Sequence, residues 1–169
     1  MGSVNSDFFT DFDTNSNSNS VPILCWDFYY ESIKELKIFS SDIKKIKQIS
    51  TRFKWNEIDV DIKKRLVNEV IVITNPEQKI IFASEGISKM TGYAENEVID
   101  KTPKIFQGPE TSKIALQEIR QAIEKQLPFE KTLLNYKKNG ETYDCKIQVF
   151  PIFNLKGQLC HFIAFEKAA

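Results

Sequence analysis

Few side chains in this sequence could carry covalent chemistry. The three cysteines, Cys25, Cys145 and Cys160, have no CxxC spacing, and His161 is the only histidine. A Ser-His-Asp or Cys-His set needs a histidine beside its nucleophile, and we expect His161 instead to be a partly exposed residue of a predicted strand. A phosphate-binding GxxxxGK[ST] loop is also missing from the sequence. The sequence therefore predicts a binding or signalling protein and not an enzyme.

The cysteines leave two interpretations open. Cys145 and Cys160 fall on the same face of two predicted strands, where they could approach each other and act as a redox sensor. Buried cysteines are more often inert packing residues, however. An odd number of cysteines without paired spacing predicts neither a disulfide framework nor a zinc site, and it fits a reducing cytoplasm.

Length and charge limit the classes of partner. The chain has 169 residues, enough for one domain and an extension. Its 23 basic residues balance its 23 acidic residues, so no overall field attracts it to nucleic acid or to an anionic membrane. The first twenty residues contain three aspartates, no Lys or Arg and no long apolar run. We therefore expect no signal peptide, no membrane contact and a cytoplasmic location.

The sequence divides into three zones. Residues 1–20 end in NSNSNS and predict a disordered polar tail. Residues 21–67 predict a helical extension for capping or dimerisation, because apolar residues recur there every three or four positions. This extension is either one helix or two helices broken near Ser40-Ser41. Its apolar stripe consists of Leu36, Phe39, Ile43, Ile46, Ile49 and Phe53.

The same extension is locally basic. Between positions 33 and 54 there are seven basic and two acidic residues, an excess of +5. This pattern is typical of the solvated face of an amphipathic helix, which we take as the first interpretation. A weak nucleic-acid-binding surface is the alternative.

Residues 68–169 change to the pattern of a mixed domain. Two β-branched runs flank the turn NPEQ, short helical stretches follow, and a longer amphipathic helix ends before Pro128. Three further strands are joined at Asn139-Gly140, a strong hairpin signal, and near Lys156-Gly157. The zone therefore predicts an α+β fold with an antiparallel sheet.

Residues 68–167 resemble the PAS superfamily. The likeness is carried by VIVITNPEQKIIFAS, MTGYAENEVIDKTP, NYKKNGETY and FPIFNLKGQLCHFIAFEK together. It implies a five-stranded antiparallel sheet of order 2-1-5-4-3 around a small pocket, with helices on one face. It also implies a sensory or interaction module.

Within that superfamily, FQGPET and LLNYKKNGE look most like the LOV branch of flavin-binding blue-light receptors. The LOV signature GxNCRFLQGxxT, aligned on Gln107-Gly108, puts Pro103 at the position of the photoreactive cysteine. A proline ring has no thiol, so this position cannot form the cysteinyl adduct. Proline also has a purely structural role as the first residue of a helix.

The LOV resemblance also implies a set of flavin contacts, some kept and some altered. Gln107 and Asn135 correspond to residues whose amides bind the flavin ring. Lys104 and Arg120 correspond to two phosphate-binding arginines, so the positive charges are kept but Lys104 lacks the guanidinium group. Thr102, Cys145 and Glu166 stand where the family has two asparagines and a switching glutamine. The residues that would contact FMN, if it binds, are Thr74, Thr102, Pro103, Lys104, Gln107, Arg120, Asn135, Cys145, Phe162 and Glu166.

Strand alternation predicts that both faces of the sheet are apolar. The face that the PAS resemblance makes the pocket face carries Val72, Thr74, Asn135, Cys145, Ile147, Val149, Cys160, Phe162, Ala164 and Glu166. The predicted outer face carries Ile71, Ile73, Leu134, Tyr136, Phe150, Leu159, His161, Ile163 and Phe165. A sheet that is apolar on both faces needs two covers, so we expect the stripe of residues 36–53 to cover the outer face, in the same chain or from a dimer partner.

Three functions follow as hypotheses. The first is a stand-alone PAS module that signals to a protein partner, or forms a homodimer, through its N-terminal helices and outer sheet face. The second is a flavin-binding photo- or redox sensor that works without the adduct. The third is a weak nucleic-acid binder that uses the basic helix.

Overall fold

The computed structural model describes the backbone of residues 23–57 and 60–169, and side chains from Tyr29 onward. The predicted tail of residues 1–20 and the side chain of Cys25 lie outside the described residues. The chain forms two units, Met1–Glu35 and Leu36–Ala169, and the boundary between them falls within the sequence of the first helix. The elements are α1 (Ile23–Phe53), α2 (Ile62–Leu66), β1 (Val70–Thr74), β2 (Ile80–Ala83), α3 (Gly86–Thr91), α4 (Glu95–Val98), η1 (Pro103–Phe106), α5 (Lys113–Glu124), β3 (Phe129–Tyr136), β4 (Thr142–Phe153) and β5 (Leu159–Ala168).

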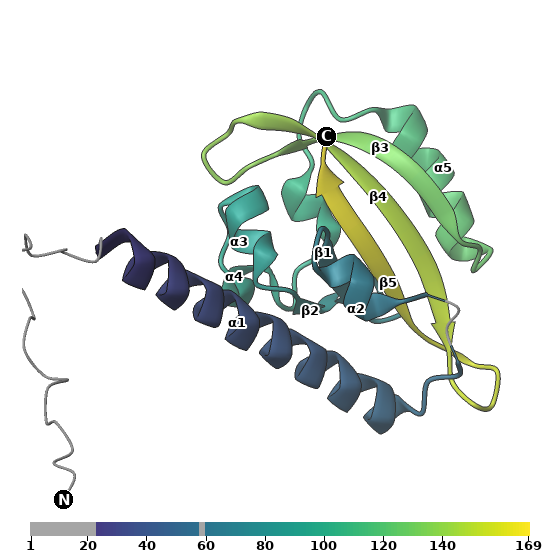
Figure 1. Ribbon diagram of the computed structural model, residues 1–169. Helices are drawn as coiled ribbons and strands as arrows, with labels where there is room; N and C mark the ends of the chain where they lie inside the picture. Colours follow the sequence, from purple (N-terminus) through teal and green to yellow (C-terminus); the bar gives the residue numbers. More distant parts are fainter. Residues whose placement is uncertain (1–22, 58–59) are drawn as a thin grey trace, which may run out of the picture. The chain divides into compact units, whose positions relative to one another are not determined.

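The second unit contains a five-stranded antiparallel sheet of order β2-β1-β5-β4-β3, as predicted (Figure 1). The predicted hairpin at Asn139-Gly140 joins β3 to β4. Gly140 there has φ +86°, a conformation that favours glycine, and the Asn139 side chain accepts a hydrogen bond from the Glu141 N–H. The central strand β5 has neighbours on both sides, β1 and β4.

Helix α1 runs without a break through the two serines. The possible division near Ser40-Ser41 is wrong, because the structure has one α-helix of 31 residues. Serine costs a helix interior only a fraction of a kcal/mol relative to alanine. The apolar stripe continues beyond the pair to Ile46 and Ile49, which pack with the outer-face cluster of the sheet, so packing outweighs that small cost.

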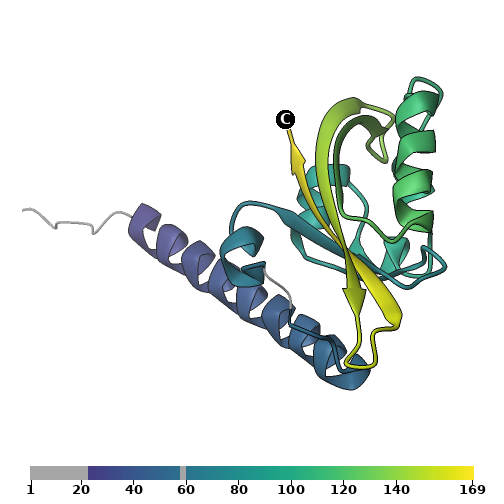
Figure 2. The ribbon, with the colours of Figure 1, turned by 90° about the vertical axis from the view of Figure 1, so that its right-hand side faces the viewer.

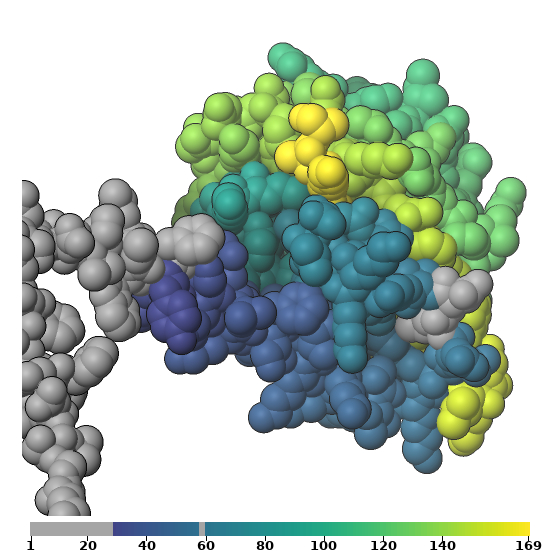
Figure 3. All heavy atoms as spheres, viewed as in Figure 1, coloured from purple at the N-terminus to yellow at the C-terminus, as the bar shows by residue number. Residues whose placement is uncertain are grey.

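The outer face of the sheet is covered by the same chain. Ile46 of α1 packs with Ile71 and Ile73 of β1 in one buried cluster, and the α2 residues Ile62 and Leu66 pack against it. Figure 2 shows the sheet between α5 on one side and α2 with the second half of α1 on the other. In Figure 3, α2 covers the sheet below the yellow end of β5. The predicted cover of the outer face is confirmed, and it comes from within the chain.

Polar contacts fix the second half of α1 to the short helices. The Lys45 ammonium donates to both carboxylate oxygens of Glu95, at 2.9 and 2.8 Å. The carboxylate of Asp42 accepts from the backbone N–H of Glu85 at 3.0 Å, and burial raises the pKa of Asp42. These contacts join residues far apart in sequence, so they define where α1 meets the domain.

His161 is fully buried, although we expected a partly exposed residue on the outer face. The residue is 1% exposed, because Phe53 at the end of α1 and Trp55, two residues beyond that end, close over it. The Trp55 indole Nε1 donates to His161 Nδ1 at 2.9 Å, and burial lowers the pKa of His161 to about 4. The imidazole is therefore neutral at pH 7 and acts as a hydrogen-bond acceptor.

Replacement of Ile46 by alanine tests the cover of the sheet. Because the Ile46 side chain is 4% exposed within the outer-face cluster, we expect Ile46→Ala to lower the free energy of unfolding by about 2–4 kcal/mol. Leu36→Ala on the same helix, at a 67% exposed position, should change it by less than about 0.5 kcal/mol. Urea denaturation followed by circular dichroism measures both. Equal losses in the two variants would contradict the packing described.

Candidate functional site: a cavity between the sheet and helix α5

A cavity of about 520 Å³ lies between the sheet and the segment formed by η1 and α5. This volume falls in the range of small-molecule sites, about 300–1,000 Å³. Its wall is mostly apolar, with Phe106 of η1, Ile119 of α5 and Phe162 of β5 among the lining residues. The polar and charged lining residues are Thr74, Glu77, Gln78, Thr102, Lys104, Gln107, Arg120, Glu124, Asn135 and Glu166.

Nine of the ten residues predicted from the LOV resemblance line this cavity: Thr74, Thr102, Pro103, Lys104, Gln107, Arg120, Asn135, Phe162 and Glu166. The tenth, Cys145, is fully buried beside the cavity, with its Sγ 4.0 Å from a carboxylate oxygen of Glu166. The resemblance thus predicted a shared site for residues from strands, turns and helices. The most distant of them in sequence, Thr74 and Glu166, are 92 positions apart.

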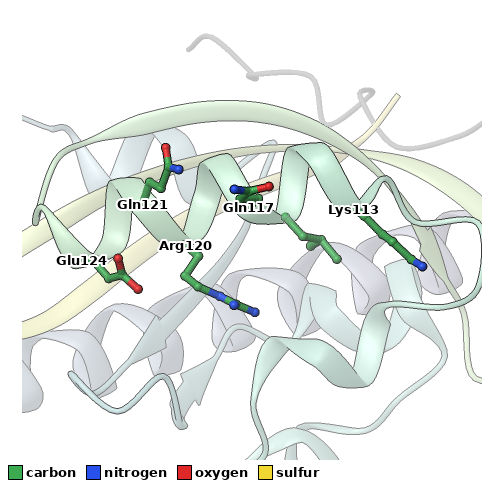
Figure 4. Close-up of a pocket in the computed structure, with 6 residues that line it drawn as sticks. Lys113, Gln117, Arg120, Gln121 and Glu124 are labelled. Carbon is green, nitrogen blue, oxygen red and sulfur yellow. The ribbon is translucent and has the colours of Figure 1, made fainter.

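Helix α5 also carries a second hollow, of about 450 Å³, lined by residues of that helix alone. Figure 4 shows Arg120 and Glu124 on one side of α5 and Gln121 on the opposite side. Arg120 and Glu124 line both the hollow and the cavity. We take the cavity as the candidate site because the sheet and α5 both enclose it.

The segment before Gln107 is shaped by Pro103. Thr102 is extended, with φ −90° and ψ 155°, the conformation that a following proline favours. Pro103 is the first residue of the 3₁₀ helix η1, where its fixed φ suits helix initiation and its missing N–H costs nothing. The predicted structural role of this proline is therefore observed, and η1 carries Lys104 and Phe106 to the cavity.

Gly108 and Thr111 attach the following loop to strand β3. A Cβ atom at Gly108 would lie 2.3 Å from the ring of Tyr136, so only glycine fits against that ring. The Thr111 hydroxyl accepts from the Gly108 N–H at 3.0 Å and donates to the Leu134 carbonyl at 2.7 Å. These contacts give the QGPET motif a physical basis, because they hold Gln107 at the cavity. Tyr136, predicted on the outer face, packs against this loop.

The polar end of the cavity contains a buried carboxyl group. Glu166 is 7% exposed, and burial raises its pKa to about 7. Burial and then the neighbouring Glu166 raise the pKa of the Cys145 thiol, and burial is the main cause of a raised pKa at Tyr143. At neutral pH the thiol is therefore protonated, and Glu166 is divided between its neutral and ionised forms.

Several buried polar atoms around the cavity have no hydrogen-bond partner among the described residues. They are Thr74 Oγ1, Gln78 Nε2, Asn135 Oδ1 and Tyr143 OH, and the first three belong to cavity-lining residues. Unsatisfied buried polar groups cost about 1–3 kcal/mol each, so native proteins rarely leave them unpaired. A bound molecule with both donors and acceptors would satisfy them, and a flavin ring with its hydroxylated side chain has both.

Two residues with unpaired buried polar atoms at the site were missed by the sequence reasoning. Gln78 lies in the turn between β1 and β2 with φ +63°, and it was interpreted only as part of a turn. Its buried amide faces the cavity because of that left-handed backbone, which no sequence pattern marks. Tyr143 was not selected either, although it pairs with Asn135 in the β3–β4 register and so lies beside a predicted site residue.

The predicted position of Cys160 on the pocket face is wrong. The pairing of β5 with β4 shifts between Ile152 and Phe153, so Cys160 is an extra residue in a bulge. It packs with the outer-face cluster, and its thiol donates to the Ile152 carbonyl at 3.2 Å. Cys145 pairs with Ala168, eight residues (168 − 160) farther along β5, a separation of about 26 Å in a strand. The two cysteines cannot form a disulfide.

The sequence of residues 68–167 matches the family model described as PAS domain. This match covers more than half of the chain. The chain belongs to the PAS domain family. No helix within the described residues is both long and apolar enough to cross a membrane. Those residues also contain no cluster of three or more His, Cys, Asp or Glu side chains suited to a metal ion.

Relatives of this PAS domain include light sensors. Protein TWIN LOV 1 of Arabidopsis thaliana is 40% identical over 88 residues, which are 52% of this chain and 22% of the relative. A blue-light-activated histidine kinase of Brucella anthropi is 36% identical over 99 residues, 57% of this chain and 20% of that protein. The matched region therefore spans about a fifth of the length of these relatives. The chain carries a sensory domain of the PAS and LOV type.

Solved LOV structures share the fold. A light-oxygen-voltage domain studied with a flavin analogue superposes with a TM-score of 0.61 at 27% identity, covering 66% of this chain and 86% of that chain. The light-state structure of the blue-light photoreceptor Aureochrome1 LOV gives a TM-score of 0.59 at 28% identity, with coverage of 65% and 89%.

The opposite pKa shifts of Glu166 and His161 predict a specific dependence of stability on pH. The pKa of Glu166 rises on folding from 4.5 to about 7, so its contribution is full below pH 4.5 and is lost as pH rises towards 7. The pKa of His161 falls from 6.5 to about 4, so its contribution is full above pH 6.5 and is lost as pH falls towards 4. The two effects oppose each other between pH 4.5 and 6.5.

Glu166→Gln separates these contributions. We expect the stability of the wild type relative to this variant to fall by about 3 kcal/mol between pH 4.5 and 7, because only the wild type must ionise a buried carboxyl group. Urea denaturation of both ligand-free proteins at several pH values measures the difference, in which other titrating groups cancel. A difference that stays constant with pH would mean that Glu166 is not held in a protonated state.

Proposed function

We propose that this PAS domain is a sensory module whose cavity binds a flavin non-covalently and which signals to a protein partner without forming a cysteinyl adduct. The observation that carries the proposal is the set of unpaired buried polar atoms on Thr74, Gln78 and Asn135 around a cavity of about 520 Å³. A pocket filled only by its own apolar side chains would not need them. The light-sensing relatives support the same class of ligand.

The residues divide the recognition of a flavin between them. Asn135 and Gln107 supply amide groups for the polar edges of the ring, and Phe162 and Ile119 supply apolar contacts. Lys104 and Arg120 supply positive charge for a phosphate, as in FMN, although Lys104 lacks the bidentate geometry of arginine. A bound flavin would supply absorption of blue light and electron-transfer chemistry.

The cysteines of the described residues support the absence of an adduct. Pro103 lines the cavity and has no thiol. Cys145 belongs to β4, and burial and the neighbouring Glu166 hold its pKa high, so it remains a poorly nucleophilic thiol. Cys160 packs with the outer-face cluster, on the other side of the sheet from the cavity.

Strand β5 connects the cavity to the covering helices. Phe162 and Glu166 line the cavity. Their sequence neighbours His161 and Phe165 lie on the opposite, outer face of the strand. His161 contacts the ring of Phe53 at the end of α1 and accepts a hydrogen bond from Trp55 just beyond it. The Arg65 guanidinium of α2 lies 3.8 Å from the centre of the Phe165 ring. A ligand-dependent shift of β5 would therefore reach α1 and α2 directly.

A protein partner or a second copy of the chain would contact α1, since the outer face of the sheet is already covered. Leu36 is 67% exposed on this helix. The weak nucleic-acid interaction stays a prediction that no observation favours. Two basic residues of α1 already form ion pairs, Lys34 with Glu31 and Lys45 with Glu95.

Absorption spectroscopy and one substitution test the proposal. The full chain, purified from cells or mixed with FMN or riboflavin, should bind flavin, and illumination should produce no increase in protein mass and no reversible adduct spectrum. Pro103→Cys should form an adduct that reverses in the dark, because position 103 lines the cavity. Ile105→Cys, also on η1 but packed outside the cavity lining, is the matched control and should form none.

Two results would contradict the proposal. Failure of the full chain to bind either flavin would leave the cavity as part of an interaction module alone. A light-dependent cysteinyl adduct in the wild type would contradict the adduct-free mechanism.

A further inference from the structure

The polar end of the cavity offers one unsatisfied acceptor and one carboxyl group, both near the Cys145 thiol. Asn135 is 5% exposed and its Oδ1 has no hydrogen-bond partner among the described residues. The Tyr143 hydroxyl lies near this amide and is likewise unpaired within the described part of the chain. Glu166, 7% exposed, lines the same cavity from the central strand.

No positive charge neutralises Glu166 within the described residues. On β1 its register partner is Val70, and on β4 its partner is Ile147. The titratable groups nearest to it are the Cys145 thiol, 4.0 Å from its carboxylate, and the Tyr143 hydroxyl, both on β4. The charged residues elsewhere on the cavity wall are Glu77 between β1 and β2, Lys104 on η1, and Arg120 and Glu124 on α5, and none forms an ion pair with Glu166.

Burial without a countercharge makes the protonated form of Glu166 accessible at neutral pH. Its pKa is raised to about 7, with burial as the cause. A protonated carboxyl group has one O–H donor, whereas the ionised form can only accept hydrogen bonds. The cavity end therefore presents an acceptor, Asn135 Oδ1, and also a donor that exists only while Glu166 holds its proton.

An acceptor and a donor at the same end of the cavity match a ligand that carries an N–H and a C=O along one edge. We propose that the cavity recognises an amide or imide edge of its ligand, with the N–H directed to Asn135 and a carbonyl to the protonated carboxyl group of Glu166, so that ionisation of Glu166 releases the ligand. This inference rests on the proposed function, because a flavin ring has such an edge. It makes Glu166 a specificity-determining residue and makes binding dependent on pH.

The dependence on pH has a defined sign and slope. When only the protonated form binds, the observed affinity is reduced by the fraction of protein that carries the proton. Affinity is then constant well below the pKa of Glu166 and falls about tenfold per pH unit above it. An amide at this position keeps a donor at every pH, so Glu166→Gln removes the dependence without removing the hydrogen bond.

Titration of the ligand-free full chain with riboflavin between pH 6 and pH 8.5 tests the inference, with binding followed by quenching of flavin fluorescence. Riboflavin is the main probe because it carries no phosphate that titrates, and FMN is the second. For the wild type we expect the dissociation constant to rise about tenfold per pH unit above about 7. Glu166→Gln should bind with a constant affinity over the whole range.

Two further variants separate this role from a general effect on the cavity. Glu124→Gln also removes a carboxylate from the cavity wall, but on α5, and it should keep the pH dependence of the wild type. Asn135→Leu should weaken riboflavin binding at every pH and leave the slope unchanged. Calorimetry in buffers of different ionisation enthalpy should detect uptake of nearly one proton on binding to the wild type above pH 7, and none with Glu166→Gln.

The outcomes separate the two proposals. Riboflavin binding by the wild type with an affinity independent of pH, or without proton uptake, would overturn the role of Glu166 and leave the proposed flavin function standing. Absence of binding of both flavins at every pH would overturn the proposed function and this inference together.

Discussion

A central strand with no face in water is the constraint on which this fold depends. β5 has strands on both sides, Phe162 and Ala164 on the cavity face, and Ile163 and Phe165 in the outer cluster. An antiparallel sheet with an apolar outer face is stable only if another element removes that face from water. The second half of α1 and the short α2 do so here. The part of the helical extension from Leu36 onward therefore belongs to the folded domain, and its contacts with the outer face are energetically significant.

This two-sided burial also explains the contrast between the two buried titratable groups of β5. His161 and Glu166 belong to the same strand, and burial favours the neutral form of each. His161 has a partner, since Trp55 donates to its Nδ1. Glu166 faces a cavity in which no cation pairs with it among the described residues. Burial therefore keeps His161 neutral as a packing residue on the outer face, whereas it leaves Glu166 on the cavity face able to change its charge near neutral pH.

Much of this architecture could be predicted because it depends on local patterns. Alternation of apolar residues identified the strands and both faces of the sheet, and the Asn139-Gly140 pair identified the β3–β4 hairpin. The LOV resemblance brought Gln107, Asn135 and Arg120 to one cavity. The errors arise where tertiary structure overrides a local rule. A bulge at Cys160 interrupts the alternation of β5 and turns this residue to the outer face. Phe53 and Trp55, which are not part of the sheet, cover His161 and bury it.

The remaining misses have the same origin. The weak helix preference of Ser40-Ser41 is overcome by packing of the residues around them, and the orientation of Gln78 follows from a left-handed backbone that many turn residues can adopt. Sequence patterns report which face a residue prefers. They do not report which loop or helix end closes over that face.

The contact between Gly108 and Tyr136 links the loop after η1 to the edge strand β3 at a distance that admits no side chain. In other members of the family, a larger residue at the first position would require a smaller ring or a displaced strand at the second. The two positions should therefore vary as a pair, and a domain that replaces only one of them must open the edge of its ligand cavity.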